Sequence, residues 1–293
     1  MPPAVRCPAG PMRAVPWRGV PWRRGLRAAW LLAPAFAAVL ALAPARPAGA
    51  APPPRTILAA VPIGRMDLPW WRRRFEAKQR ELHRRRVGLV FYGDSITQDW
   101  ERAGPQPWAD FRPIWQHYYA GRGAVNLGFV GDTTASLIWR IDHGEASGID
   151  PKVAVVLIGA NDMGLPHWSA AETVDGIETV VRLLHQHLPR TKILLLAVLP
   201  SERSAWITRT TAAINHRLAA RYGHGRVGWV TYLDLTGLFL RHGRLDTSLF
   251  LDPRLHPPAP PLHPTAPAQA RMAAAMEPVL ARLLGDRPRP PWR

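Results

Sequence analysis

The sequence has little cysteine, little lysine and no long apolar run. Its one cysteine, Cys7, excludes a disulfide framework within the chain. No apolar run reaches the roughly 18–20 residues of a membrane-spanning helix, which excludes a polytopic membrane protein. Lysine occurs at only three of the 293 positions, so arginine carries almost all of the positive charge. With 47% hydrophobic residues, the chain still contains enough apolar material for a full core.

The first 50 residues have the pattern of an export signal. Several arginines precede an apolar run over 28–43, and a small-x-small sequence ends at Ala50. We expect cleavage after Ala50 and an exported protein, either periplasmic or secreted. A retained membrane anchor is the alternative, disfavoured by Pro34 and by the shortness of the run. The pair Arg23-Arg24 would suit twin-arginine export.

Beyond the signal, we expect a linker at 51–65, one domain at 66–285 and a disordered tail at 286–293. Much of the formal net charge of +17 comes from seven arginines in the first 50 residues. The densest basic stretch of the domain, 72–86, is predicted to be the solvated face of a helix. No recognition motif accompanies the charge, so we expect no nucleic-acid partner and at most weak attraction to anionic lipid or cell-wall polymer.

From residue 87 onwards, short β-branched runs alternate with longer runs of helical periodicity. This alternation is typical of an α/β fold with a parallel sheet. The expected strands are 87–92, 124–128, 153–159, 193–199 and 227–233. The third and fourth are almost wholly apolar, as expected of strands that helices cover on both faces, so we place them inside the sheet.

Capping signals indicate the two clearest helices. Ser169 and Glu172 form a capping box ahead of a helical apolar stripe over 174–188. A second stripe, over 272–284, follows Thr265 as its cap. We expect the methionines and leucines of this last helix to lie in the core rather than around a cofactor.

The chemistry is expected just after the strands, because ligands of an open parallel sheet bind beyond the carboxyl ends. After the first strand, Ser95 stands at a strand-to-helix turn, as a nucleophile or only a helix cap. After the second, Gly131 offers a backbone N–H for an oxyanion, or forms only a tight turn. After the third, Asn161 can donate from its amide, or is only a turn former. The conjunction of all three favours a catalytic site.

On these residues the sequence resembles the SGNH (GDSL) family of serine hydrolases. Ser95 in Gly-Asp-Ser-Ile-Thr matches the nucleophile block, Gly131 in Asn-x-Gly-x-x-Gly-Asp the second, and Asn161 in Gly-x-Asn-Asp the third. The stretch 131–153 is similar to the catalytic subunits of platelet-activating-factor acetylhydrolase. The resemblance covers roughly 66–284. It implies a flavodoxin-like three-layer α/β/α sandwich with a five-stranded parallel sheet, and an esterase acting on short acyl groups.

The sequence departs from the family at the fourth block, which is normally Asp-x-x-His before the final helix. His263 stands directly ahead of that helix and is our expected base, but Pro260 occupies the position of the acid. Asp252 is the nearest upstream acid and reaches His263 only if the segment 253–261 loops out. Otherwise a backbone carbonyl would orient the imidazole. His256, four residues after Asp252, is the rival base.

The expected mechanism is acyl transfer through the serine. His263 takes the proton of Ser95, an acyl-enzyme forms, and the N–H groups of Ser95 and Gly131 and the Asn161 amide stabilise the oxyanion. No cofactor and no metal are expected, because none of the eleven histidines belongs to a His-Glu-x-x-His motif. Walker and dinucleotide fingerprints are absent as well.

The substrate is expected to be a small-molecule ester or an acetylated glycan. Lysophospholipids are a further candidate class of substrate. A homodimer is left open. Trp100, Trp108 and Trp115 follow the nucleophile and either line a pocket or pack in the core. The alternative from another class is a non-catalytic carbohydrate- or lipid-binding module on the same fold, because fold alone does not determine function.

Overall fold

The computed structural model describes residues 56–105 and 111–292, all of which belong to the unit Pro54–Arg293. The predicted signal peptide at 1–50 and its cleavage site lie outside the described residues, as does Trp108. None of the helices in the described ranges combines the length and the apolar character needed to cross a membrane.

Five parallel strands form one sheet. They are β1 (Leu89–Gly93), β2 (Ala124–Gly128), β3 (Val153–Leu157), β4 (Lys192–Leu196) and β5 (Val230–Leu233). Their order is β2-β1-β3-β4-β5, which is the order of flavodoxin-like folds. The predicted five-stranded parallel sheet is therefore confirmed, and β3 and β4 lie inside it as expected.

Strands β1 to β4 bury side chains on both faces of the sheet, whereas the edge strand β5 buries only Val230. In β1, Val90 and Tyr92 belong to one core cluster, whereas Leu89 and Phe91 belong to the cluster on the opposite face. Strands with two buried faces need apolar residues at nearly every position, which explains the uninterrupted apolar runs of the sequence.

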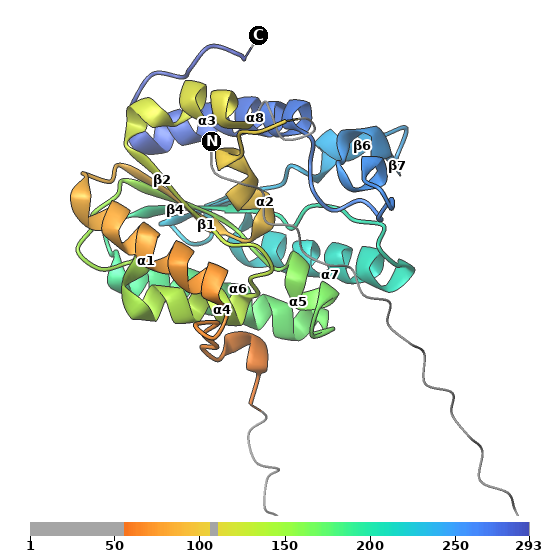
Figure 1. The fold of residues 1–293 in the computed structure, drawn as a ribbon, viewed down its shortest axis with the longest axis horizontal. Helices are drawn as coiled ribbons and strands as arrows, with labels where there is room; N and C mark the ends of the chain where they lie inside the picture. The colour runs from red at the N-terminus through yellow and green to blue at the C-terminus, as the bar shows by residue number, and fades with distance from the viewer. Residues whose placement is uncertain (1–55, 106–110, 293) are drawn as a thin grey trace, which may run out of the picture. The chain divides into compact units, whose positions relative to one another are not determined.

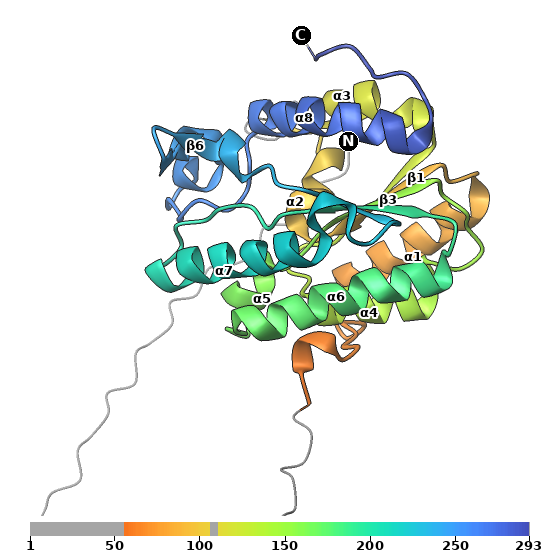
Figure 2. The same ribbon diagram turned by 180° about the vertical axis from the view of Figure 1, so that it is seen from behind.

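Helices cover both faces of the sheet (Figures 1 and 2). One face carries α1 (Pro69–Arg84), α4 (Thr134–Arg140), α6 (Ala170–His187) and α7 (Ala205–Tyr222), and the other carries α3 (Phe111–Tyr118) and α8 (Ala266–Leu284). The short helices α2 (Ser95–Gln98) and α5 (Ala160–Gly164) follow β1 and β3 directly. The three-layer α/β/α sandwich implied by the family resemblance is thus confirmed.

The two predicted helix caps are present. Ser169 and Glu172 form a complete capping box, with the Glu172 carboxylate accepting from the Ser169 N–H at 2.8 Å. The Thr265 hydroxyl accepts from the Ala268 N–H at 3.3 Å and so caps α8. Both predictions succeeded because a cap is a local signal that tertiary contacts do not change.

The structure differs from the sequence prediction at strand ends and in one hairpin. β3 ends at Leu157 rather than at residue 159, because Gly159, with φ +121°, already turns the chain into α5. A two-stranded hairpin, β6 (Leu240–Arg241) with β7 (Arg244–Leu245), was not predicted. Two residues per strand are too few for a period of two to be visible in the sequence.

The flanks of the domain are more closely attached than the predicted linker and tail suggest. In the expected linker, Ala59 is fully buried and its carbonyl accepts from the Thr134 hydroxyl at 2.8 Å. In the expected tail, the Arg289 N–H donates to Glu277 at 2.6 Å and the Trp292 N–H to the Tyr118 hydroxyl at 2.9 Å. Residues 286–292 therefore lie against α3 and α8 rather than extending freely.

Two of the three tryptophans that follow the serine are core residues. Trp100 is 2% exposed and Trp115 9% exposed, and both pack against Tyr119. Both belong to the cluster between the sheet and the α3–α8 layer. Both rings therefore pack in the core, and Trp115 also borders a surface pocket beside Arg74 and Arg112.

Candidate active site

Ser95 lies at the turn where β1 ends and α2 begins. Gly93 makes this turn possible, because a Cβ there would lie 2.1 Å from Thr97 Oγ1. The Asp94 carboxylate accepts a hydrogen bond of 2.9 Å from the Ile96 N–H and caps α2. Since Asp94 is the cap, the Ser95 hydroxyl is available for another partner.

The Ser95 hydroxyl is joined to two further side chains by hydrogen bonds. Ser95 Oγ lies 2.9 Å from His263 Nε2, and His263 Nδ1 lies 2.7 Å from Asp252 Oδ1. An ionised carboxylate can only accept, so we assign the ring proton to Nδ1, which leaves Nε2 to accept from the serine. This is the geometric relation of nucleophile, base and orienting acid in serine hydrolases.

A short antiparallel pairing brings Asp252 and His263 together although ten residues separate them. Phe250 and Pro264 form a β-bridge, and the Leu251 N–H donates to the His263 carbonyl at 2.8 Å. Asp252 Oδ2 accepts from the His263 N–H at 2.6 Å as well as from the N–H of Leu262. The intervening segment loops out, so the Asp-x-x-His spacing of the family is not required for contact.

The rival histidine does not share this position. His256 lies exposed in the looped-out segment, and Ser95 is in contact with His263 instead. The structure therefore brings together Ser95, His263 and Asp252 and leaves His256 outside the group. The carboxylate of Asp252, rather than a backbone carbonyl, is the partner of the His263 ring.

The Asp252–His263 contact shifts the pKa of both residues. Burial alone raises the pKa of Asp252, but hydrogen bonds from the His263 ring and N–H outweigh it, and the pKa lies below the ordinary 3.8. Burial alone lowers the pKa of His263, but Asp252, with smaller effects of Asp99 and Asp94, raises it above the ordinary 6.5. Asp252 thus remains ionised near neutral pH, and the imidazole is a stronger base than free histidine.

The loops that follow β2 and β3 flank the Ser95 turn, because β1 lies between these two strands. The Phe129 N–H donates to the Gly93 carbonyl at 3.1 Å, which holds the loop after β2 against the turn. The Thr134 N–H donates to Asp162 Oδ1 at 2.9 Å, which joins the loops after β2 and β3. The three strand ends therefore form one cross-linked unit around the serine.

Gly131 and Asn161 lie in these two flanking loops. Gly131 has φ +72°, and its backbone N–H has no acceptor among the described residues. The Asn161 side-chain amide donates to the Asp132 carbonyl at 3.0 Å, which fixes it beside Gly131 and leaves its second hydrogen to donate elsewhere. The Ser95 N–H, at the start of α2, likewise meets no acceptor within the described ranges.

A fully buried arginine, Arg140, supports the loop that contains Gly131. Its guanidinium donates to Asp132 Oδ2 at 2.8 Å and to the Gly93 carbonyl at 3.1 Å, and it also pairs with Glu145. The Asp132 carboxylate accepts a further hydrogen bond of 2.8 Å from the Trp71 indole. Arg140 was not predicted to have a role, although an arginine on the core side of a short apolar helix is a signal visible in the sequence.

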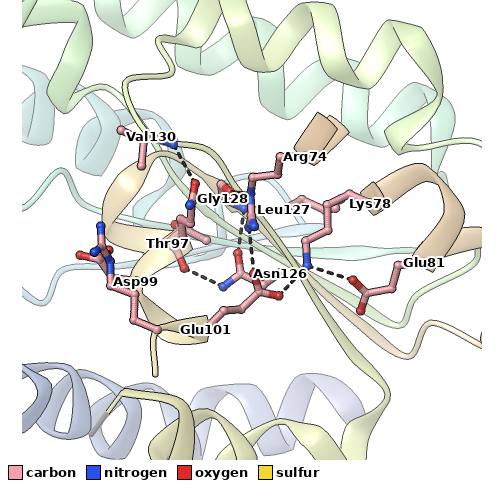
Figure 3. A network of polar contacts seen from close by, with 12 residues as sticks. Arg74, Lys78, Glu81, Thr97, Asp99, Glu101, Asn126, Leu127, Gly128 and Val130 are labelled. Carbon is pink, nitrogen blue, oxygen red and sulfur yellow. Dashed lines mark hydrogen bonds and ion pairs between the residues drawn. The ribbon is translucent and has the colours of Figure 1, made fainter. Parts of the chain in front are cut away.

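Helix α1 braces the same region through its basic side chains (Figure 3). Arg74 donates to the Gly128 carbonyl at 2.8 Å and to Glu101 at 2.9 Å. Lys78, which is 6% exposed, pairs with Glu101 at 2.5 Å and with Glu81 at 2.9 Å. The prediction that 72–86 is only a solvated face is therefore wrong at these two positions, where long side chains reach acidic partners distant in sequence.

The first residue of the second motif, Asn126, connects α2 to β2. Its amide donates to the Thr97 carbonyl at 2.7 Å, and its oxygen accepts from the Gly128 N–H at 2.8 Å (Figure 3).

Over 56–105 and 111–292, no group of three or more His, Cys, Asp or Glu side chains is placed to hold a metal ion.

Comparison with known proteins groups the chain with one family. The sequence model described as the GDSL-like Lipase/Acylhydrolase family matches residues 91–271, more than half of the chain. The platelet-activating factor acetylhydrolase IB subunit alpha2 of Gallus gallus is 34% identical over 133 residues, which cover 45% of this chain and 53% of that protein. The chain thus spans about half the length of the curated relatives it matches.

Solved structures give the same fold. A GDSL-like lipase from Bacteroides thetaiotaomicron has a TM-score of 0.54 at 17% identity and covers 72% of this chain and 97% of its own. A carbohydrate acetylesterase from Sinorhizobium meliloti has a TM-score of 0.51 at 14% identity and covers 68% of this chain and 100% of its own. At such identities these likenesses show the fold alone.

Proposed function

The chain belongs to the GDSL-like lipase/acylhydrolase family, and from that premise we propose that it is a serine esterase. In this proposal Ser95 is the nucleophile, His263 the general base and Asp252 the residue that orients the base. The observation that carries the proposal is the pair of hydrogen bonds, 2.9 Å and 2.7 Å, that joins the three side chains.

The reaction proceeds in two halves. As Ser95 Oγ attacks the carbonyl carbon, its proton moves to His263 Nε2, and a C–O bond forms between enzyme and acyl group. The tetrahedral intermediate collapses when the bond to the alcohol breaks and His263 returns the proton to the departing alcohol. His263 then takes a proton from water, whose oxygen attacks the acyl-enzyme. The bond between the acyl carbon and Ser95 Oγ breaks, His263 returns the proton to Oγ, and the acid is released.

The developing oxyanion needs donors on the side away from His263. The N–H groups of Ser95 and Gly131 and the remaining amide hydrogen of Asn161 are the donors we assign to it. Removal of one such donor costs about 2.7–4 kcal/mol of transition-state stabilisation in known enzymes. The cross-links between the three strand ends support the assignment, because they hold these donors in place before the substrate arrives.

A short acyl group, most simply acetyl, on a glycan or a lipid is the proposed substrate. The curated relative is named an acetylhydrolase and one structural neighbour a carbohydrate acetylesterase, and both names point to acetyl esters. The basic and apolar pattern of residues 1–50 supports export of the enzyme, which would place it beside extracellular esters.

A non-catalytic binding module on the same fold is the second candidate. Such a module needs no base within reach of the serine, so the hydrogen bond between Ser95 and His263 favours the enzyme. The low exposure of Ser95, 5%, fits a residue that meets a reacting group rather than a large surface ligand.

The test is hydrolysis of p-nitrophenyl acetate, butyrate and octanoate by the purified chain. We expect turnover of the acetate to exceed that of the octanoate and to be lost in Ser95→Ala. Ser147→Ala, a substitution in a distant exposed turn, is the matched control and retains wild-type rates. Retained turnover in a folded Ser95→Ala variant would refute the assigned nucleophile, and no hydrolysis of any ester would favour the binding module.

A further inference from the structure

Six arginines of the described ranges are wholly or partly buried. They are Arg65, Arg74, Arg102, Arg122, Arg140 and Arg203. Five of them form ion pairs with carboxylates, as a charge removed from water requires. Arg203 is the exception, because no carboxylate in the described ranges lies within ion-pair distance of it. An unpaired, partly buried guanidinium would be stabilised by an anion from outside the described residues.

Arg203 lies in the loop between β4 and α7 and contacts both flanks of the proposed active site. Its Nη2 donates to the Ala160 carbonyl at 2.7 Å, immediately before Asn161. Its Nε donates at 3.2 Å to the Ser201 hydroxyl, which itself donates to the Pro261 carbonyl at 2.6 Å. Arg203 thus lies between the loop of the proposed oxyanion donor and the loop that ends at His263.

The position of the guanidinium is defined by a glycine. A Cβ at Gly164 would lie 2.3 Å from Arg203 Nη1, so only the absence of a side chain leaves room for that end of the group. Both hydrogens on Nη1 have no acceptor among the described residues, and one on Nη2 also remains. A planar fork with spare donors suits bidentate binding of a carboxylate or a phosphate.

The charges near Ser95 act on this arginine without pairing with it. Burial lowers the pKa of Arg203, while the charges of Asp94 and Asp252 act in the opposite direction. Asp94 itself has its pKa raised to about 7, mainly by burial, so near neutral pH it is only partly ionised. Asp252 is already committed to His263. Neither carboxyl therefore takes the place of an external anion.

Resting on the proposed esterase function, we infer that Arg203 binds an anionic group, a carboxylate or a phosphate, on the ester substrate. The anion accepts hydrogen bonds from the free Nη1 and Nη2 hydrogens of the guanidinium, and this contact orients the ester bond relative to Ser95. Arg203 is in this account a specificity residue, whose contribution appears with charged substrates and is absent with neutral ones.

Two matched pairs of esters test the inference. Mono-4-nitrophenyl succinate and 4-nitrophenyl butyrate differ by a charge on the acyl side, and 4-acetoxybenzoate and 4-acetoxybenzamide differ by a charge on the alcohol side. In Arg203→Gln we expect kcat/KM for the anionic member of one pair to fall at least about tenfold, mainly through KM, and the neutral member to change less than about threefold. The pair that responds identifies the side on which the anion lies.

Two further variants separate recognition from support of the loop. Arg209→Gln removes an exposed arginine from the same region, on α7, and leaves all rates unchanged. Gly164→Ala retains the charge but displaces the guanidinium, so it reproduces the selective loss on the same pair. The Gly164 backbone is not in the left-handed region, so alanine introduces no backbone strain there.

The outcomes distinguish the inference from the function on which it rests. If Arg203→Gln lowers kcat/KM equally for anionic and neutral esters, Arg203 only supports the Ala160 carbonyl, and the inference is overturned. Unchanged rates in both pairs overturn it as well and leave the esterase proposal intact. Failure of the wild-type chain to hydrolyse any neutral or anionic ester overturns the esterase proposal, and the inference with it.

Discussion

The proposed active site joins two regions that are held in different ways. The strand ends of β1, β2 and β3 contain Ser95 and the proposed oxyanion donors, within a buried network that includes Arg140. The segment 249–265 contains Asp252 and His263 and lies outside the sheet. Leu249, Phe250 and Leu251 anchor its start in the core, whereas the Asp252–His263 part is held by one β-bridge and by hydrogen bonds from backbone N–H groups to the Asp252 carboxylate. The strand-end side chains are thus tied into a buried ion-pair network, whereas Asp252 and His263 are positioned mainly by hydrogen bonds within their own segment.

Substitutions in the two regions should therefore affect stability and activity differently. A lost side chain in the strand-end network leaves buried partners unpaired, so stability falls together with activity. Loss of the partly exposed His263 side chain removes chemistry but little buried area, so activity falls in a protein that remains folded. The following predictions test this separation.

The largest effect is expected for His263→Ala. Loss of the proposed base should reduce kcat by about 10⁶-fold or to the limit of detection, as in a serine hydrolase whose histidine is removed. His256→Ala, in the same segment, is the matched control and should retain activity within about twofold. The measurement is hydrolysis of p-nitrophenyl acetate together with thermal unfolding. Equal losses in the two variants would contradict the assignment of His263.

Asp252→Asn is expected to lower kcat by about 10⁴-fold, because the ring of His263 loses the partner that fixes its tautomer. It should also shift the pH profile. Only the neutral imidazole accepts the serine proton, so kcat/KM rises as pH increases through the pKa of His263. Asp252 raises that pKa, so its replacement moves the acid limb to lower pH.

The residual activity of Asp252→Asn, followed from about pH 4 to 9, is the readout for this shift. In that variant burial, which lowers the pKa of His263, is opposed only by the smaller effects of Asp99 and Asp94. An acid limb that remains in place would show that Asp252 does not act on the titrating base.

Arg140→Gln tests the other region. Arg140 is fully buried and pairs with Asp132 and Glu145, so its removal leaves two buried carboxylates without their cation. We expect the free energy of unfolding to fall by about 3–5 kcal/mol, measured by urea denaturation. Arg74→Gln, which removes a partly exposed pair, is the comparison and should cost less. A stable Arg140→Gln variant would contradict the described difference between the regions.

The sequence predicted the fold and the strand-end residues more fully than the segment 249–265. Apolar strands, helix caps and the Gly-Asp-Ser turn are local signals, and the parallel sheet then brings consecutive strand ends to one edge. Nothing local indicates that Asp252 reaches His263, because that contact depends on a looped-out segment and a one-residue bridge. The ion pairs of Lys78 with Glu101 and of Arg140 with Asp132 were missed for the same reason, since these partners are determined by the tertiary fold.

The central claim is that Ser95 is an activated nucleophile, and covalent labelling tests it most directly. The chain is incubated with a fluorophosphonate, which reacts with serines that a neighbouring base activates. Mass spectrometry should show one adduct per chain, located on Ser95, with labelling abolished in His263→Ala and unchanged in His256→Ala. Absence of the adduct, or its location on another residue, would contradict the account.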